Sequence, residues 1–98
     1  MKGDIKNSNT EYLFRALAAV NTAEEVEALL DDLCTIGEVQ EMSNRIAAAK
    51  MLASGSTYNE ICEATGLSTA TVTRVNRALK YGSGGYKLIL DRIERRGE

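Results

Sequence analysis

The sequence predicts an all-α protein of six helices, and three observations lead to that prediction. The chain has no proline and is 44% hydrophobic over 98 residues, so we expect nearly continuous helix with brief breaks. Three Thr-x-x-Glu segments begin at Thr22, Thr35 and Thr57. Each fits a capping box, in which the Thr hydroxyl and the Glu carboxylate satisfy backbone N–H groups at a helix start. Behind these segments, apolar residues recur with the 3.6-residue period of an amphipathic helix.

The six helices follow one another along the chain. The first is expected over residues 12–20, the second directly after Thr22, and the third directly after Thr35, ending near Ser54-Gly55. The fourth and fifth form a closely spaced pair within residues 57–79, and the sixth lies over residues 86–93. The periodic apolar positions are Tyr12, Leu13, Phe14, Leu17 and Val20, then Val26, Leu29, Leu30 and Leu33, then Val39, Met42, Ile46, Ala49 and Ala53, and last Tyr86, Ile89, Leu90 and Ile93.

Residues 57–79 have the spacing of a helix-turn-helix. Cys62 is the small residue expected to be buried in the first helix of the pair, where two crossing helices leave little room. Gly66 follows four residues later, at the tight turn, where the backbone must be left-handed and glycine carries no steric penalty. The apolar residues expected to fill the angle between the two helices are Ile61, Leu67, Val72 and Val75.

The outer face of the second helix of this pair is the candidate DNA-binding surface. Ser68 is placed to cap that helix, and no acidic residue occurs between Ser68 and Lys87. Arg can reach guanine or a phosphate, and short Thr and Ala side chains can meet a thymine methyl in the major groove. An ordinary helical hairpin with a solvated face is the alternative interpretation. The candidate DNA-binding residues are Ser68, Thr69, Ala70, Thr73, Arg74, Arg77 and Lys80.

The charge is distributed unevenly along the chain. The net charge of the whole sequence is -2, but residues 1–66 carry 5 Lys and Arg against 11 Asp and Glu, whereas residues 67–98 carry 7 against 3. The global basic signature of many nucleic-acid-binding proteins is therefore absent. An acidic body with a basic DNA-reading end fits this pattern and predicts modest non-specific affinity for DNA.

Several other classes of protein find little support. The chain has no histidine, and its carboxylates are spread along helix faces, so no nucleophile has a base beside it and an enzyme is not expected. Cys34 and Cys62 are too few for a disulfide scaffold or a metal site, and no cofactor is implied. Without a signal peptide or an apolar run of about 18 residues, we expect a cytoplasmic protein with no membrane contact. A helical adaptor that binds another protein remains an alternative.

The apolar residues of two helices suggest a homodimer. Residues around Tyr12 and around Ile46 are apolar on more than one face, and such helices must be buried on several sides. A chain of this length buries only about 60 to 70% of its unfolded surface by itself. An intertwined homodimer would bury the surplus and would place two reading helices about 34 Å apart along B-DNA. A compact monomer with a broad core is the alternative.

The sequence resembles the tryptophan repressor family over residues 10–93, and more narrowly its YerC/YecD-type relatives. The segments that carry the resemblance are residues 70–80 and the long helix that contains Asn44-Arg45-Ile46 and ends at Ser54-Gly55. The resemblance implies one domain over residues 1–98, with a helix-turn-helix at 57–79 and a dimerisation body at 10–53 and 84–94. It also implies a six-helix, intertwined dimer that binds double-stranded DNA and represses transcription at a palindromic operator.

The resemblance also marks a ligand pocket, which in the family's founding member holds tryptophan. Thr35, Arg45, Thr71 and Arg74 match pocket positions, but Val75 stands where tryptophan-binding members have glycine, and Ala78 replaces a serine. Because valine would fill the slot that an indole needs, we expect no dependence on tryptophan. A response to a different, unidentified small ligand stays open. Alternatively, Arg74 contacts a phosphate and Arg45 pairs with Glu41, four residues before it.

Overall fold

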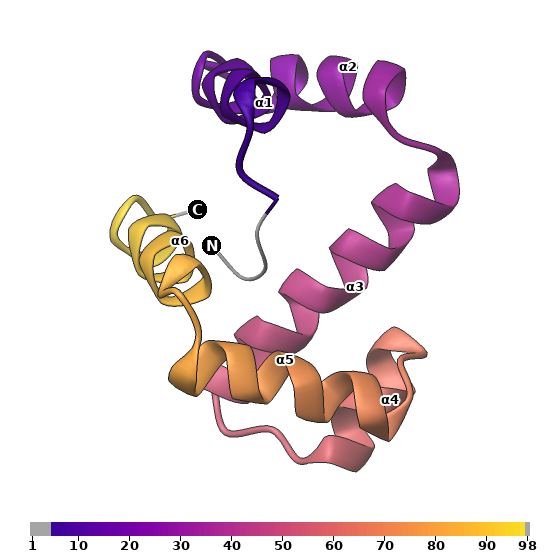
Figure 1. The fold of residues 1–98 in the computed structure, drawn as a ribbon. Coiled ribbons are helices and arrows are strands. Elements are labelled where there is room, and N and C mark those ends of the chain that lie inside the picture. Colours follow the sequence, from indigo (N-terminus) through magenta and orange to yellow (C-terminus); the bar gives the residue numbers. More distant parts are fainter. Residues whose placement is uncertain (1–4, 98) are drawn as a thin grey trace. The chain divides into compact units, whose positions relative to one another are not determined.

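The computed structural model describes residues 5–97 and contains six helices and no strand in that range (Figure 1). The predicted all-α fold class is therefore confirmed. Residues 1–4 and 98 of the predicted domain lie outside the described residues. The chain divides into two compact units, residues 1–39 and 40–98. The helices are α1 (Ser8–Ala18), α2 (Ala23–Leu33), α3 (Ile36–Ala53), α4 (Tyr58–Thr65), α5 (Thr69–Tyr81) and α6 (Gly85–Arg95).

The helix starts lie where the Thr-x-x-Glu pattern predicted them. α3 and α4 begin with complete capping boxes: the N–H of Thr35 donates to the Glu38 carboxylate at 2.8 Å and the N–H of Thr57 donates to the Glu60 carboxylate at 2.7 Å. In return, the two Thr hydroxyls accept from the N–H groups of Glu38 and Glu60. These backbone N–H bonds stabilise the ionised carboxylates, so the pKa values of Glu38 and Glu60 are lowered.

The second helix departs from a full capping box. The Thr22 hydroxyl accepts from the N–H of Glu25 as expected, but the Glu25 carboxylate accepts from the N–H of Asn21 at 2.7 Å, one residue earlier than the box requires. A further box, which the pattern did not predict, starts α1, where the Asn7 side chain accepts from the N–H of Thr10 and the Thr10 hydroxyl accepts from the N–H of Asn7. Asn and Thr replace Thr and Glu there.

α1 ends earlier than its apolar pattern suggested. The helix stops at Ala18, and Val20 lies beyond its last turn. Thr22 must adopt extended backbone angles, φ -133° and ψ 161°, to cap α2, so the chain has to leave the helical conformation before it. The apolar periodicity continues past the end of α1 to Val20. Such a pattern indicates which residues avoid water, but it does not indicate where the helical backbone hydrogen bonds end.

The unit of residues 1–39 contains α1 and α2 and has no buried residue in either helix. Tyr12 is 67% exposed, and its ring lies 5.6 Å from the Arg15 guanidinium, in the range of a cation–π contact. Other large apolar side chains of the two helices are also exposed: Leu13, Phe14, Leu17, Val26 and Leu33. These helices bury little apolar surface within the single chain.

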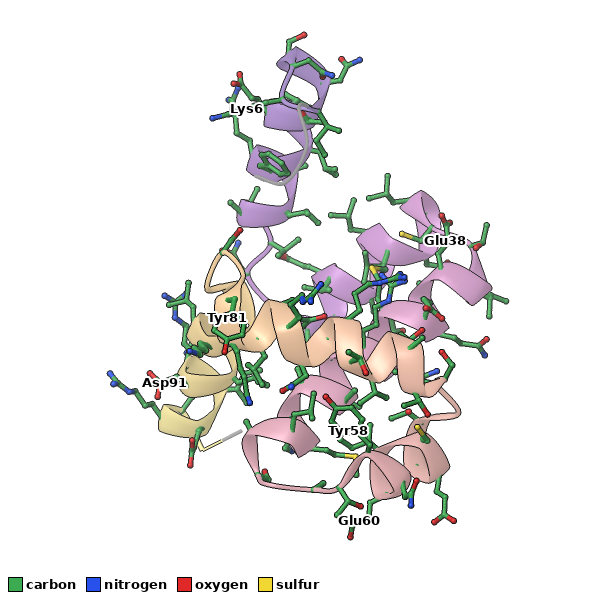
Figure 2. All side chains as sticks on the ribbon, turned by 60° about the horizontal axis from the view of Figure 1, so that its bottom comes forward. Lys6, Glu38, Tyr58, Glu60, Tyr81 and Asp91 are labelled. Carbon is green, nitrogen blue, oxygen red and sulfur yellow. The ribbon has the colours of Figure 1, made fainter. Side chains whose placement is uncertain are left out.

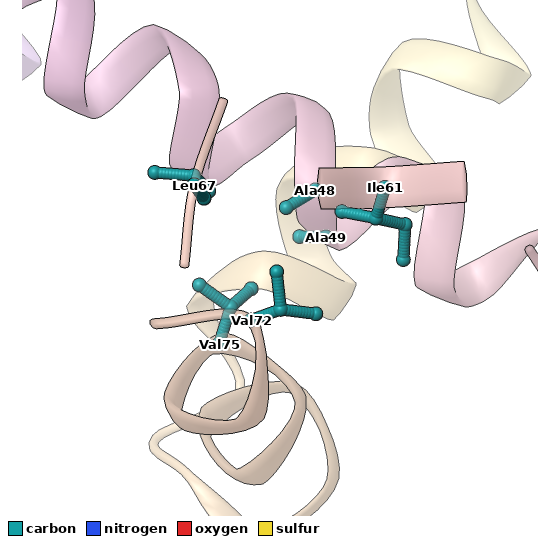
Figure 3. Close-up of a cluster of buried hydrophobic side chains, with 6 residues drawn as sticks. All are labelled: Ala48, Ala49, Ile61, Leu67, Val72 and Val75. Atoms are coloured by element: carbon teal, nitrogen blue, oxygen red, sulfur yellow. The ribbon is translucent and has the colours of Figure 1, made fainter. Parts of the chain in front are cut away.

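The unit of residues 40–98 has a closed hydrophobic core (Figure 3). Two small residues of α3, Ala48 and Ala49, are fully buried in this core. Tyr86 and Leu90 of α6 pack against the same cluster. The buried residues are Ala48, Ala49, Ile61, Leu67, Val72 and Val75, so the prediction that the last four fill the angle between α4 and α5 is confirmed.

Cys62 was predicted to be buried, and this prediction was wrong because the side chain is only partly buried. Its side chain is half-buried at the edge of this cluster, with its Sγ 3.9 Å from the Thr69 hydroxyl oxygen. Ile61, the preceding residue, takes the fully buried position on α4. The small residues that are fully buried in this cluster, Ala48 and Ala49, belong to α3.

None of the helices in residues 5–97 has the length and apolar character needed to cross a membrane.

Candidate nucleic-acid interface

α4 and α5 are joined by a three-residue turn whose backbone geometry follows from its residues. Gly66 ends α4 in the left-handed conformation, with φ 76°, and its N–H donates to the Cys62 carbonyl at 2.8 Å. Leu67 turns into the core, and the Ser68 hydroxyl then accepts from the N–H of Thr71 at 3.2 Å, which caps α5. The turn therefore fixes where α5 begins and which of its faces is buried.

α5 has one buried face and one exposed face. Val72 is fully buried and Val75 is 4% exposed, whereas the side chains on the opposite side are open to solvent. We call the exposed side of this helix the outer face of α5, and it consists of Thr69, Ala70, Thr73, Arg74, Arg77, Lys80 and Tyr81. Six of these seven are the DNA-binding candidates that the sequence suggested, and Ser68 lies just before them as the cap.

The outer face of α5 is basic and carries no internal counter-charge. α5 contains no acidic residue. Arg74, Arg77 and Lys80 form no ion pair with any residue in the described range, whereas exposed cations elsewhere do, as in the Arg45–Glu41 pair at 3.0 Å. Three cations beside short Thr and Ala side chains can contact phosphates and base edges together.

The residues of the expected ligand pocket are divided between the two units. Thr35 belongs to the unit of residues 1–39, where its hydroxyl caps α3. Arg45 on α3 is paired with Glu41 at 3.0 Å, as the alternative interpretation predicted. The other four pocket positions, Thr71, Arg74, Val75 and Ala78, all lie on α5.

The pocket positions on α5 differ in how accessible they are. Thr71 is half-buried, and its hydroxyl lies 3.1 Å from that of Ser68. Val75 is buried in the same hydrophobic cluster as Val72 and Ala49 (Figure 3). Ala78 is half-buried and offers no polar group, whereas Arg74 is exposed.

Sequence reasoning missed Tyr81. This tyrosine is the last residue of α5 and is 83% exposed, more than any other large hydrophobic side chain in residues 5–97 (Figure 2). It lies four residues after Arg77, so it belongs to the same stripe of the helix. That spacing was the available signal.

These features define an all-α protein whose α4–α5 pair exposes one basic helix face. The family model described as Trp repressor protein matches residues 8–94. The chain belongs to this family.

Three similar proteins support the assignment. The uncharacterized protein YerC of Bacillus subtilis (strain 168) is 40% identical over 90 residues, which are 92% of this chain and 86% of YerC. The crystal structure of a candidate Trp repressor from Staphylococcus aureus matches with a TM-score of 0.85 at 40% identity, covering 91% of this chain and 89% of that one. A TrpR-like protein from Eubacterium eligens ATCC 27750 matches with a TM-score of 0.86 at 42% identity, covering 91% and 92%.

Proposed function

We propose that this protein is a sequence-specific DNA-binding regulator of transcription, which binds a palindromic operator as a homodimer and does not need tryptophan. It acts as a single domain, with α5 as the reading helix, and has no enzymatic activity. Membership of the Trp repressor family is what favours repression over activation. Double-stranded DNA and a second copy of the chain are its proposed partners, and the cytoplasm is its proposed location.

The observation that carries the proposal is the outer face of α5. All of its cations lack an internal counter-charge among the described residues, and the short side chains between them leave room for base edges. A helix face that served only solubility would gain from carboxylates placed to pair with its cations. This face instead keeps its positive charge available for phosphates, whose contacts dominate the affinity for DNA.

Homodimerisation is supported by apolar surface that one chain leaves uncovered. α1, α2 and α6 have no buried residue. Within the unit of residues 40–98, a groove of about 600 Å³ lies between α3 and α6, lined in part by Ile46, Leu90 and Ile93. Soluble monomers rarely expose such extended apolar surface, which usually marks an interface. A second copy would supply the covering helices, and its symmetry would match a palindrome.

Independence from tryptophan is supported by the state of the pocket residues. Val75 is 4% exposed, and it stands at the position where the resemblance implies that tryptophan-binding members have a glycine. The polar groups retained at Thr35, Arg45 and Thr71 already have partners within the chain, namely the N–H of Glu38, the Glu41 carboxylate and the Ser68 hydroxyl. No ligand is needed to satisfy them.

The central experiment selects bound sequences from random duplex DNA, in parallel with and without tryptophan. We expect the same palindromic motif in both arms, from a protein whose mass in solution is that of a dimer. A motif that appears only with tryptophan would overturn ligand independence. A folded dimer that selects no sequence in either arm would overturn DNA reading and favour a protein-binding adaptor or a different effector.

A Val75→Gly variant tests the pocket directly. Removing the valine side chain should open a slot beside Ala78, so calorimetry should detect tryptophan binding to the variant and none to the unaltered protein. Val75→Ala is the matched control, because it opens less space while keeping helix propensity near its best value. Tight binding of tryptophan by the unaltered protein would contradict the role given to Val75.

A further inference from the structure

Tyr81 is the one residue of the outer face of α5 that the proposed function gives no role, and it lies directly after Lys80. It is 83% exposed, and its hydroxyl forms no hydrogen bond with any residue in the described range. Two other tyrosines of the same unit, Tyr58 and Tyr86, pack instead against the hydrophobic cluster. An exposed aromatic ring beside Lys80 and one turn after Arg77 is therefore not explained by folding of this unit.

The position of Tyr81 is fixed by the residue that follows it. The N–H of Gly82 donates to the Ala78 carbonyl at 2.9 Å and so closes the last turn of α5. A Cβ atom at residue 82 would collide with that same carbonyl group, so only glycine allows the chain to leave the helix in this way. Tyr81 thus stands on an ordered helical turn and not on a loose tail.

Distance along α5 determines what Tyr81 can reach on DNA. It lies twelve positions after Thr69, which is about 18 Å along the helix axis at about 1.5 Å per residue. The major groove is about 12 Å wide, and recognition helices contact base edges through their N-terminal residues. When Thr69 and Thr73 lie at base edges, Tyr81 lies past the groove wall, at the sugar-phosphate backbone.

Resting on the proposed function, we infer that Tyr81 is a positioning residue for DNA, whose phenolic hydroxyl donates a hydrogen bond to a backbone phosphate at the groove rim. Tyrosine is among the side chains that make such contacts, which set the register of a protein on the duplex without reading bases. Lys80 beside it provides the charge for the same stretch of backbone. Because the phenol is neutral, its contact releases no counterion, which separates its effect from that of Lys80.

The test compares Tyr81→Phe with Lys80→Ala by fluorescence anisotropy, on the selected palindrome and on a random duplex, between about 50 and 200 mM salt. Tyr81→Phe removes only the hydroxyl. We expect about tenfold weaker binding to both duplexes with an unchanged salt slope, the effect of losing one hydrogen bond to a charged group. Lys80→Ala should lower the slope by about 0.9 for each phosphate released.

The outcomes separate this inference from the proposed function. Three results for Tyr81→Phe would overturn the phosphate contact: unchanged affinity for DNA, a changed sequence preference, or a mass in solution that falls to that of a monomer. None of these results would affect the palindrome that the unaltered protein selects. If the unaltered protein selects no sequence, the proposed function fails first and the role of Tyr81 fails with it.

Discussion

The two units of this chain follow the same sequence rules but differ in what they bury. Both contain amphipathic helices that begin at side-chain caps, yet residues 40–98 enclose six fully or nearly buried side chains, whereas α1 and α2 bury none. The comparison shows that helix formation and core formation are separate problems here. Local sequence signals determine helix formation in both units, but only the unit of residues 40–98 forms a hydrophobic core within a single chain.

The physical basis of the difference is the size and spacing of the apolar residues. In the unit of residues 40–98, Ala48 and Ala49 let branched side chains from α4 and α5 fit against α3 (Figure 3). In the other unit the apolar residues are large, such as Tyr12 and Phe14, and two short helices cannot enclose them. The unit of residues 40–98 should therefore respond to mutation as a folded core, and the unit of residues 1–39 as an interface.

The largest effect is expected from Ile61→Ala. Ile61 is fully buried, so truncation should lower the free energy of unfolding by about 2 to 5 kcal/mol, through lost burial and the cavity left behind. Urea denaturation measures the change. Ile61→Val is the graded control and should cost only about 0.5 to 1.5 kcal/mol. A loss below about 1 kcal/mol for the Ala variant would mean that this core is not tightly packed.

A smaller and different effect is expected from Leu17→Ala on α1. Leu17 is 41% exposed in the single chain, so truncation should cost little in an isolated monomer. In the proposed dimer the same side chain becomes covered, and the variant should weaken dimerisation by about 1 to 2 kcal/mol. Sedimentation equilibrium measures the dissociation constant, with Glu27→Gln on α2 as a control. An unaltered protein that is monomeric at every concentration would contradict this.

The turn between α4 and α5 should be sensitive to its backbone alone. Gly66 has φ 76°, and a Cβ atom there would meet nothing within 4 Å, so the cost of Gly66→Ala comes only from the left-handed conformation. We expect a loss of about 1 kcal/mol in the free energy of unfolding. Gly66→Asn should lose less, because Asn tolerates this region better. Equal losses for both variants would show that something other than backbone strain operates at the turn.

These comparisons also show how far the sequence alone could lead. The helix starts at Thr22, Thr35 and Thr57 were predictable, because capping depends on residues three apart, and so was the core role of Ile61. The exact partner of Glu25 and the end of α1 were not, because each depends on how the intervening backbone bends. The exposure of Tyr81 also lay beyond the pattern, since periodicity places a residue on a face but cannot tell whether the next helix covers it.

The smallest effect is expected at the two capping boxes that are closed by a Glu carboxylate, one at Thr35 in the unit of residues 1–39 and one at Thr57 in the unit of residues 40–98. In both, a backbone N–H bond to the carboxylate is the main cause that lowers the pKa of the Glu, from an ordinary value of 4.5. A carboxyl group whose pKa is depressed by folding stabilises the native state above its unfolded pKa. That contribution is lost as the pH falls through the lower, folded value.

Glu38→Gln and Glu60→Gln should therefore each be slightly less stable than the unaltered protein near neutral pH, and the difference should shrink as the pH falls below 4.5. Urea denaturation between pH 7 and pH 3 measures it, and carboxyl chemical shifts report the two titrations directly. Because both side chains are exposed and the bonds are local, the two variants should behave alike despite the difference in burial between their units. A pH-dependent loss of stability seen only for Glu60→Gln would mean that the cap at Thr35 needs a packed core to form. Helix formation and core formation would then not be separate problems in this chain.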